Sequence, residues 1–439
     1  MGTLQKLTGT EDILPITQFV GQEIKVADVG IWQRVEAIAR EILHRAAYRE
    51  IRTPIFEQTA LFERGIGEAT DVVGKEMYTF KDRGDRALTL RPENTAGVAR
   101  AYIQHSLYAQ GGAQRLWYSG PMFRYERPQK GRQRQFSQLG VEVIGSRDPR
   151  ADAEVIAIAT DILQAVGLKN LSFYLNSVGN QSDRQAYREA LVEYLTPYKD
   201  ELDADSRDRL SRNPLRILDS KDAKTQEIVQ SAPSILAYLC DDSRQHFDTV
   251  QQLLTDLNIV YQLNPCLVRG LDYYTHTAFE IQSADLGAQA TVCGGGRYDG
   301  LITELGGPDT AAVGWAMGLE RLTLLLQQLQ ESQPPELDFY LVSRGEQAEG
   351  QTLAIAQRLR QAGFSVEIDL SSSAFGKQFK RADRSGAVGC LILGDSEAEH
   401  GTLQLKWLRT EEQQELSQAD LPSAIPQLRQ HIQQQRQSL

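Results

Sequence analysis

Short strand-like runs joined by tight turns are the feature that most limits how residues 80–320 can fold. Apolar or aromatic runs occur at 88–90, 116–118, 141–143, 173–175 and 279–281, and turn-forming residues stand at 82–85 and at 119–121. Parallel strands need crossover connections of a dozen residues or more, usually helical, and few of the intervening segments fit that description. The pattern therefore predicts an antiparallel sheet flanked by helices, an α+β core.

Two helical regions accompany these runs. Asp28 can cap a first helix in which apolar residues recur at helical spacing from Ile31 to Ala46, and Pro54 ends the pattern soon afterwards. Residues 182–255 carry long polar-apolar helical patterns with little strand character. We expect this segment to be a helical insertion within the first domain.

A stretch rich in Gln, Ser and Pro at 327–335 separates two regions that differ in their pattern of expected strands and helices. After it, strands expected at 339–342, 366–370, 388–393 and 403–408 alternate with helices expected at 348–362, 375–384 and 425–435. This alternation favours a small α/β domain with a mostly parallel sheet. The expected division is a first domain at 1–330, a linker at 331–336 and a C-terminal domain at 337–439.

Charge and composition exclude several classes of protein. The 47 Lys and Arg against 58 Asp and Glu give a net charge of −11, so contact with nucleic acid must come from local basic clusters. No run approaches the roughly 18 apolar residues of a membrane helix. The four cysteines and six histidines lack the spacing of a zinc site. We expect a cytoplasmic protein with reduced thiols, no zinc and no membrane contact.

The densest chemical signal is the run from Arg124 to Arg134, which holds five cations and one acid around Pro128 and Gly131. A basic hairpin loop of this kind can hold a triphosphate or a nucleic-acid backbone, because arginine matches phosphate oxygens with paired donors. A merely solvated charged hairpin is the alternative on this feature alone.

Three further clusters follow along the chain. Residues 267–275 place an arginine, an acid and two tyrosines together, which suggests recognition of a small polar ligand. Residues 293–300 hold successive glycines that let backbone approach a ligand, although a tight structural turn explains them equally well. Residues 311–322 read as a strand running into a helix, where Arg321 alone would be an ordinary surface charge.

In this order, the clusters resemble the histidyl-tRNA synthetase family of class II aminoacyl-tRNA synthetases, in its bacterial type, over nearly the whole chain. Residues 9–15 are similar to its N-terminal element, the helix leading to Pro54 to motif 1, 123–142 to motif 2 and 314–322 to motif 3. Residues 269–274 and 294–298 are similar to segments specific to the histidine enzymes. Motif 1 implies a homodimer. Glu11 and Asn94 depart from the family, which commonly has Arg and Gly there.

The resemblance implies that histidine attacks the α-phosphorus of ATP and that the acyl group then passes to the 3′ end of tRNA(His). It places Arg124 on the α-phosphate, Arg321 on the γ-phosphate and Glu126 near the adenine, with Mg²⁺ bridging the phosphates. Arg269 would lie between the histidine carboxylate and the α-phosphate. The alternative for Arg269 is an ion pair with Asp272 that shapes the loop.

The family also implies residues for the other ligand groups. Its histidine pocket would comprise Glu93, Thr95 and Gln138 for the ammonium, and Glu142 and Tyr274, with Tyr273 alongside, for the imidazole. Its acceptor-end contacts would be Arg127, Gln129, Lys130 and Arg132, with the helical insertion against the acceptor arm. Its anticodon contacts would be Lys377, Phe379, Lys380 and Arg381, although an amphipathic surface helix is also consistent with that segment.

Two other functions belong to different classes. A synthetase-like regulatory subunit would bind histidine and activate a phosphoribosyltransferase of histidine biosynthesis without charging tRNA, and an RNA-binding protein could use an inactive synthetase core. The regulatory paralogues usually lack the C-terminal domain and parts of the 269–274 and motif 2 segments. This chain has all of these, so the sequence favours the synthetase.

Overall fold

The computed structural model describes residues 4–15, 27–67, 70–129, 131–285, 291–329 and 337–437. The chain forms two compact units, one built from residues 25–331 with the segment up to Leu14, the other containing residues 332–439. The expected linker at 331–336 and Lys130 lie outside the described residues. Within the described ranges, no helix combines the length and apolar character needed to cross a membrane.

The first unit is built on an eight-stranded sheet in the order β10-β9-β11-β12-β13-β8-β7-β3. Pairing is antiparallel from β9 through β7 and parallel at the two ends, β10 with β9 and β3 with β7, so the predicted antiparallel core is confirmed. In that order the strands span Gln262–Leu263, Leu171–Ser177, Thr275–Ser283, Thr291–Arg297, Ala312–Gly318, Gln135–Ile144, Gln114–Phe123 and Arg49–Glu50.

The run at 88–90 belongs to a different sheet. It forms β6 (Ala87–Leu90), which pairs with β4 (Phe56–Gln58) and β5 (Tyr78–Lys81) in a three-stranded sheet. The turn predicted at 82–85 connects β5 to β6. A further pair joins β1 (Ile13–Leu14) to β2 (Ala27–Asp28).

The turn predicted at 119–121 is wrong, because these residues continue β7 and pair with β8. The Pro121 carbonyl accepts a hydrogen bond from Arg91 Nε at 2.8 Å, and the Phe123 amide donates to the Arg91 carbonyl at 2.9 Å. The backbone of Pro121 thus faces away from β8. A proline fits there, since no ladder hydrogen bond needs its missing N–H.

Alternating residues of the central strands face two different environments. Odd-numbered residues of β8 and β13, such as Val141 and Trp315, pack in an apolar core with helices α1, α4, α8 and α10. Asp148 caps α4 by accepting from the Arg150 amide at 2.9 Å, and Pro149 occupies its first turn. These helices span Val29–Arg45, Pro149–Ala165, Asp241–Asp256 and Leu319–Leu329.

The opposite side of the first unit carries shorter helices: α2 (Thr59–Ile66), the π-helix η1 (Val72–Glu76), α3 (Thr95–Gln104), the 3₁₀ turn η2 (Leu107–Gln110) and α9 (Leu301–Glu304). Val98, Tyr102 and Leu301 pack with Tyr118 and Tyr298 in a second apolar cluster beside the even-numbered face of the sheet. That cluster leaves room on the sheet for polar side chains.

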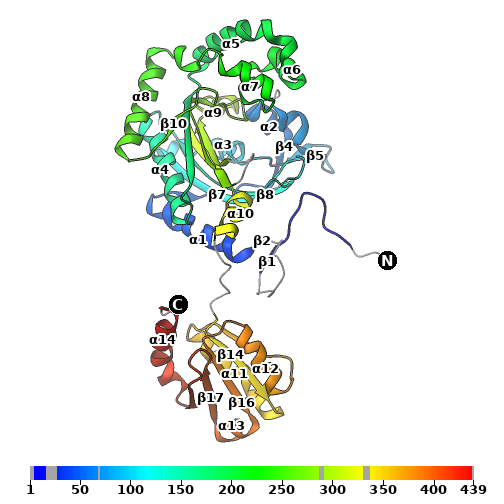
Figure 1. The fold of residues 1–439 in the computed structure, drawn as a ribbon, viewed down its shortest axis with the longest axis vertical. Coiled ribbons are helices and arrows are strands. Elements are labelled where there is room, and N and C mark those ends of the chain that lie inside the picture. The colour runs from blue at the N-terminus through cyan, green and yellow to red at the C-terminus, as the bar shows by residue number, and fades with distance from the viewer. Residues whose placement is uncertain are drawn as a thin grey trace. The chain divides into compact units, whose positions relative to one another are not determined.

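The segment predicted as a helical insertion is helical, and it has a core of its own around Tyr187, Leu191 and Ile217. Its elements are α5 (Gln181–Leu195), η3 (Thr196–Glu201), α6 (Ala204–Arg212), η4 (Pro214–Asp219), α7 (Ala223–Gln230) and η5 (Ile235–Ala237). The following helix, α8, differs, because Phe247, Val250 and Leu254 pack with α4 in the main core (Figure 1).

The second unit is a five-stranded sheet in the order β15-β14-β16-β17-β18. The strands β15, β14 and β16 are parallel, but β17 and β18 are antiparallel, so the sheet is mixed where a mostly parallel one was expected. The short helix α13 between β16 and β17 and the strand β18 were not predicted. The elements are β14 (Phe339–Arg344), α11 (Glu346–Gln361), β15 (Val366–Ile368), α12 (Phe375–Arg384), β16 (Gly389–Gly394), α13 (Asp395–His400), β17 (Thr402–Trp407), β18 (Gln413–Ser417) and α14 (Leu421–Gln437).

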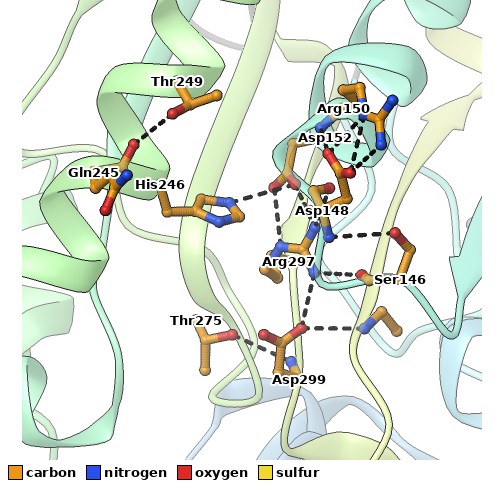
Figure 2. Close-up of polar contacts among 11 residues, drawn as sticks. Ser146, Asp148, Arg150, Asp152, Gln245, His246, Thr249, Thr275, Arg297 and Asp299 are labelled. Carbon is orange, nitrogen blue, oxygen red and sulfur yellow. Dashed lines mark hydrogen bonds and ion pairs between the residues drawn. The ribbon is translucent and has the colours of Figure 1, made fainter.

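A buried ion pair fixes the end of β12 against α4 (Figure 2). Arg297 and Asp152 are 1% and 0% exposed, and two nitrogens of the Arg297 guanidinium donate to the two Asp152 oxygens. Arg297 also donates to the Ser146 carbonyl at 2.8 Å and to Asp299 at 3.2 Å. Burial alone would raise the pKa of Asp152, but Arg297 and His246 hold it at about 2.

Replacing Asp152 by Ala should therefore strongly lower the free energy of unfolding. It removes the fully buried partner of Arg297 and leaves only the single contact with Asp299, and breaking a buried pair in this way costs about 3–5 kcal/mol. Asp309→Ala is the matched control, since Asp309 and its partner Arg147 are 77% and 62% exposed and such pairs contribute at most about 1 kcal/mol. Denaturant unfolding of the three proteins measures the difference. Equal losses of stability in the two variants would contradict a special role for the buried pair.

Candidate active site

A cavity of about 770 Å³ opens on the even-numbered face of the sheet in the first unit. It brings together most residues that the sequence singled out, from five separated segments of the chain. Its lining includes Glu93, Thr95, Arg124, Glu126, Arg132, Gln138, Glu142, Arg269, Tyr273, Tyr274 and Arg321. Arg127 and Gln129 are exposed in the loop between β7 and β8 and are not part of the lining.

Strand register orders the cavity along its length. Gln138 and Glu142 lie on one face of β8, four residues or about 13 Å apart at 3.3 Å per residue. Gln138 pairs with Gly318, directly before α10 and Arg321, whereas Glu142 pairs with Gly314. Gln138 therefore marks the Arg321 end of the cavity and Glu142 the opposite end.

The floor of the cavity needs glycine at two positions. A β-carbon on Gly314 would overlap the Glu142 carboxylate, and one on Gly294 would overlap the Arg269 guanidinium. Residues 293–297 lie within β12 and are not the tight turn considered for them. The bare strands let two charged side chains rest directly on the sheet.

Glu142 is the centre of a buried hydroxyl cluster. Its Oε1 accepts from Thr95 Oγ1 at 2.8 Å and from the Tyr118 hydroxyl at 3.4 Å, and its Oε2 accepts from the Tyr298 hydroxyl. Burial raises the pKa of Glu142 to about 8, although the hydrogen bonds from Tyr298 and Thr95 oppose that rise. The ring of Tyr273 contacts the rings of both Tyr274 and Tyr298 beside this cluster.

Glu93 caps the start of α3 as well as lining the cavity. Its carboxylate accepts from the backbone amides of Thr95 at 2.6 Å and Ala96 at 2.9 Å. Burial raises its pKa against these two hydrogen bonds. Each carboxylate oxygen keeps a further acceptor site, so capping the helix and binding a cation are compatible. The neighbouring Asn94 is 1% exposed and accepts from Thr53 Oγ1 at 2.5 Å.

Three arginines gather at the other end. Arg124 donates from Nε to the Pro92 carbonyl at 2.8 Å, and Arg132 pairs with Glu126 at 3.2 Å. Arg321 donates to the backbone carbonyl of Thr291 at 2.6 Å. Burial, followed by repulsion from Arg132, lowers the pKa of Arg321 to about 10. With Glu126 as the acid among them, this end has an excess of positive charge suited to phosphate oxygens.

Arg269 lies between the two ends. It rests on Gly294, which pairs with Ala316, which in turn pairs with Gly140, midway between Gln138 and Glu142. Its Nη1 pairs with Glu280 at 2.7 Å, so the ion pair with Asp272 considered from the sequence is wrong. Burial acts to lower the pKa of Arg269, but the Glu280 carboxylate raises it overall.

Three buried polar atoms lining the cavity have no hydrogen-bond partner among the described residues: Gln138 Oε1, Arg269 Nε and Glu320 Oε2. An unpaired buried polar group costs about 1–3 kcal/mol. A polar ligand in the cavity can remove that cost.

Sequence reasoning missed Glu280, Tyr298 and Glu320. Glu280 was detectable, because an acid between Phe279 and Ile281 on a predicted strand must face away from the apolar core. Tyr298 adjoins the glycine run but carries no signal of its contact with Glu142. Glu320 accepts from the Ser137 amide at 2.7 Å, and burial raises its pKa to about 7.

In the second unit, Lys377 and Lys380 are exposed on α12, and the half-buried Phe379 stacks on Phe375 with ring centroids 5.7 Å apart. Arg381 differs from the expected free contact residue. It donates to Asp369 at 2.7 Å and to Ser373 at 2.6 Å, so it holds the loop after β15 in place.

The raised pKa of Glu142 predicts a pH-dependent stability. A carboxyl whose pKa is higher in the folded state stabilises fully below its unfolded value, and that contribution is lost as the pH rises through about 8. Glu142→Gln should therefore gain stability relative to the unsubstituted protein as the pH rises from about 5 to 8. Thermal melts over this range measure the gain. Glu63→Gln, the same substitution at an exposed position on α2, is the matched control. A stability difference between Glu142→Gln and the unsubstituted protein that stays constant over this pH range would contradict the raised pKa of Glu142.

Comparisons with known proteins agree along the whole chain. The family described as Histidyl-tRNA synthetase matches residues 23–322, and the Anticodon binding domain family matches residues 338–428. A histidine–tRNA ligase of a Picosynechococcus species is 70% identical over 99% of both chains. One from Gloeothece citriformis is 69% identical over 100% of this chain and 99% of that protein.

Solved structures share the fold. An apo histidyl-tRNA synthetase of S. aureus, 37% identical, superposes with a TM-score of 0.79 over 96% of this chain and 100% of that one. A Bacillus halodurans protein described as an ATP phosphoribosyltransferase regulatory subunit/histidyl-tRNA synthetase, 21% identical, has a TM-score of 0.62 over 87% and 97% of the two chains, which shows the fold alone. By the family match and the identities over its full length, the chain belongs to the histidyl-tRNA synthetase family.

Proposed function

We propose that the protein activates L-histidine with ATP and transfers it to the 3′ end of tRNA(His), giving histidyl-tRNA, AMP and diphosphate. One observation carries the proposal: a single cavity places a buried Glu142 pocket at one end, an arginine cluster at the other and Arg269 between them. The relatives named histidine–tRNA ligase support the same activity.

The first step needs positioning and charge stabilisation more than covalent catalysis. A carboxylate oxygen of histidine forms a bond to the α-phosphorus, and the bond from that phosphorus to the bridging oxygen breaks, releasing diphosphate with the electron pair. In the proposed arrangement Arg124 binds the α-phosphate, Arg321 the γ-phosphate, and Glu126 contacts the adenine. Mg²⁺ enters as part of the ATP substrate.

Arg269 is the proposed catalytic bridge, together with Arg124. Its guanidinium lies between the two ends of the cavity, where it would contact both the carboxylate and the α-phosphate, and its Nε lacks a protein partner among the described residues. Developing negative charge at phosphorus would be stabilised by these preorganised donors.

Histidine selection would rest on the buried Glu142 end of the cavity and on Gln138, four residues along β8 toward the Arg321 end. Glu93, Thr95 and Gln138 would bind the ammonium group, while Glu142 and Tyr274, with Tyr273 beside them, would pair the imidazole nitrogens. A buried site built for two ring nitrogens leaves groups unpaired with any other amino acid, which can discriminate by about 10⁴-fold or more.

The tRNA contacts are proposed from the loop between β7 and β8 and from the second unit. Arg127, Gln129, Lys130 and Arg132 would meet the acceptor end, and Lys377, Phe379 and Lys380 the anticodon, where a stacked aromatic among cations suits bases and phosphates. Arg381 would act there through the loop that it holds. We also propose a division into domains at 1–330 and 337–439.

A homodimer in the cytoplasm completes the proposal. The segment after the first helix exposes Ile55, Phe56 and Phe80 by 44%, 54% and 44%, a cluster of apolar side chains that a second copy could cover.

Exchange of labelled diphosphate into ATP tests the function directly. The purified chain should catalyse exchange with histidine and with no other amino acid, and Arg124→Ala should reduce it by about 10²-fold, as expected for one donor to developing charge. Arg150→Ala, on the far side of the sheet and 79% exposed, should leave exchange unchanged. Histidine binding without any exchange would instead support the regulatory-subunit function.

Arg269→Lys tests the catalytic bridge. A lysine keeps the charge and can still meet Glu280, but it cannot span a carboxylate and a phosphate with the geometry of a planar guanidinium. Adenylate formation should slow by about 10²- to 10³-fold while histidine binding weakens only modestly. Rapid-quench kinetics, histidine titration and thermal melts together measure this. A rate loss explained wholly by unfolding would remove Arg269 from the catalytic role.

A further inference from the structure

The loop that carries Arg269, Tyr273 and Tyr274 has no regular strand or helix to hold it. It runs from β10 to β11, and its backbone carbonyls need hydrogen-bond donors from elsewhere because its residues are half-buried or buried. The carbonyls of four of its residues find those donors in the helical insertion.

Two arginines of the insertion supply the hydrogen bonds. Arg216, on η4, donates from Nη1 to the Arg269 carbonyl at 3.0 Å and from Nη2 to the Gly270 carbonyl at 2.9 Å. Arg184, on α5, donates from Nη1 to the Tyr274 carbonyl at 2.8 Å and to the Asp272 carbonyl at 3.2 Å. Arg216 therefore holds the start of the stretch 269–274, and Arg184 holds its end.

These cations are placed at some electrostatic cost. Burial lowers the pKa of both guanidinium groups, and the charge of Asp272 offsets this only in part. No ion pair joins either group to a carboxylate within the part of the chain that the structure describes. Both arginines are buried and donate to backbone carbonyls despite the free-energy cost of burying their charge. This indicates that the conformation of the loop is important for the site.

The middle of the loop is fixed by other contacts. Asn213, which directly precedes η4, donates to Asp272 Oδ1 at 2.8 Å, and the Asp272 amide donates to the Ile66 carbonyl at the end of α2 at 3.1 Å. Residues 269–274 are thus held between α2 and the insertion, with Arg216 at the start of this stretch and Arg184 toward its end.

We infer that Arg184 and Arg216 are positioning residues for adenylate formation: Arg216 sets the backbone from which the Arg269 guanidinium reaches the reacting groups, and Arg184 sets the backbone of Tyr274 in the histidine pocket. The inference rests on the proposed function and extends it, because it makes the insertion a structural part of the amino-acid activation site.

The two positions predict different kinetic defects. Arg216→Met should lower kcat for histidine-dependent exchange by about 10²-fold, the loss typical of a catalytic group displaced by about 1 Å, with the KM for histidine nearly unchanged. Arg184→Met should mainly raise the KM and Kd for L-histidine, by about tenfold, since it disturbs the pocket and not the charge at phosphorus. Exchange kinetics and calorimetric titration with L-histidine measure both.

Arg188→Met is the matched control. Arg188 lies on α5 like Arg184, and it donates to the Ser211 carbonyl at 3.2 Å, a contact that stays within the insertion. It should retain the kcat and KM of the unsubstituted protein. Exchange defects in Arg188→Met equal to those of the other two variants would overturn the inference, because general loosening of the insertion would then explain them.

Further outcomes are decisive. Folded Arg184→Met and Arg216→Met proteins with unchanged kinetics would overturn the inference. If either variant fails to fold in circular dichroism, Arg184→Lys and Arg216→Lys are measured instead. Lysine keeps the charge but lacks the paired donors, so the same split between kcat and KM should appear, and unchanged lysine variants would overturn the inference. Absence of exchange in the unsubstituted protein would contradict the proposed function, while the histidine titration would still test Arg184.

Discussion

The buried ion pair between Arg297 and Asp152 anchors the strand on which the cavity depends. β12 has to present bare backbone to the cavity, so Gly294, Gly295 and Gly296 contribute no side chain that could hold this end of the strand in place. Arg297 provides that hold from the opposite face, beneath α4. The next residue, Tyr298, turns to the cavity and bonds Glu142. One pair of adjacent residues therefore connects the core of the fold to the substrate pocket.

The cavity holds charged groups that burial partly removes from water. Their shifted pKa values reflect the free-energy cost of losing that solvation. Burial raises the pKa of Glu93 and Glu142 at one end and lowers that of Arg321 at the other. A ligand with a cation at the first end and phosphates at the second reverses both penalties. In the proposed arrangement an amino acid and a nucleotide would bind in one orientation, because exchanging their positions would place like charges together.

Local patterns predicted the strands and helices well but could not reveal contacts between distant segments. The runs at 116–118 and 141–143 became the paired strands β7 and β8, because short runs of apolar or aromatic residues favour buried strands. Residues 119–121 were wrongly predicted as a turn. A strand tolerates a proline where no neighbouring strand needs its N–H, and the local sequence does not show where that is. The partners of Arg269, Tyr298 and Arg381 lie 8 to 156 residues away in sequence, a relation that no spacing rule contains.

Some residues of the cavity stand on a central strand and others on a loop. Substitutions near the two groups should therefore affect different quantities, the free energy of unfolding for the strand and the rate of activation for the loop. Gln138 and Glu142 stand on a central strand, so displacing them means disturbing the sheet itself. Arg269 and Tyr274 stand on a loop whose carbonyls are bound by two arginines from the insertion. Changes around the strand residues must alter the free energy of unfolding. Changes around the loop can shift the reacting groups while the core remains intact, so the helical insertion is where the rate of activation can vary independently of the fold.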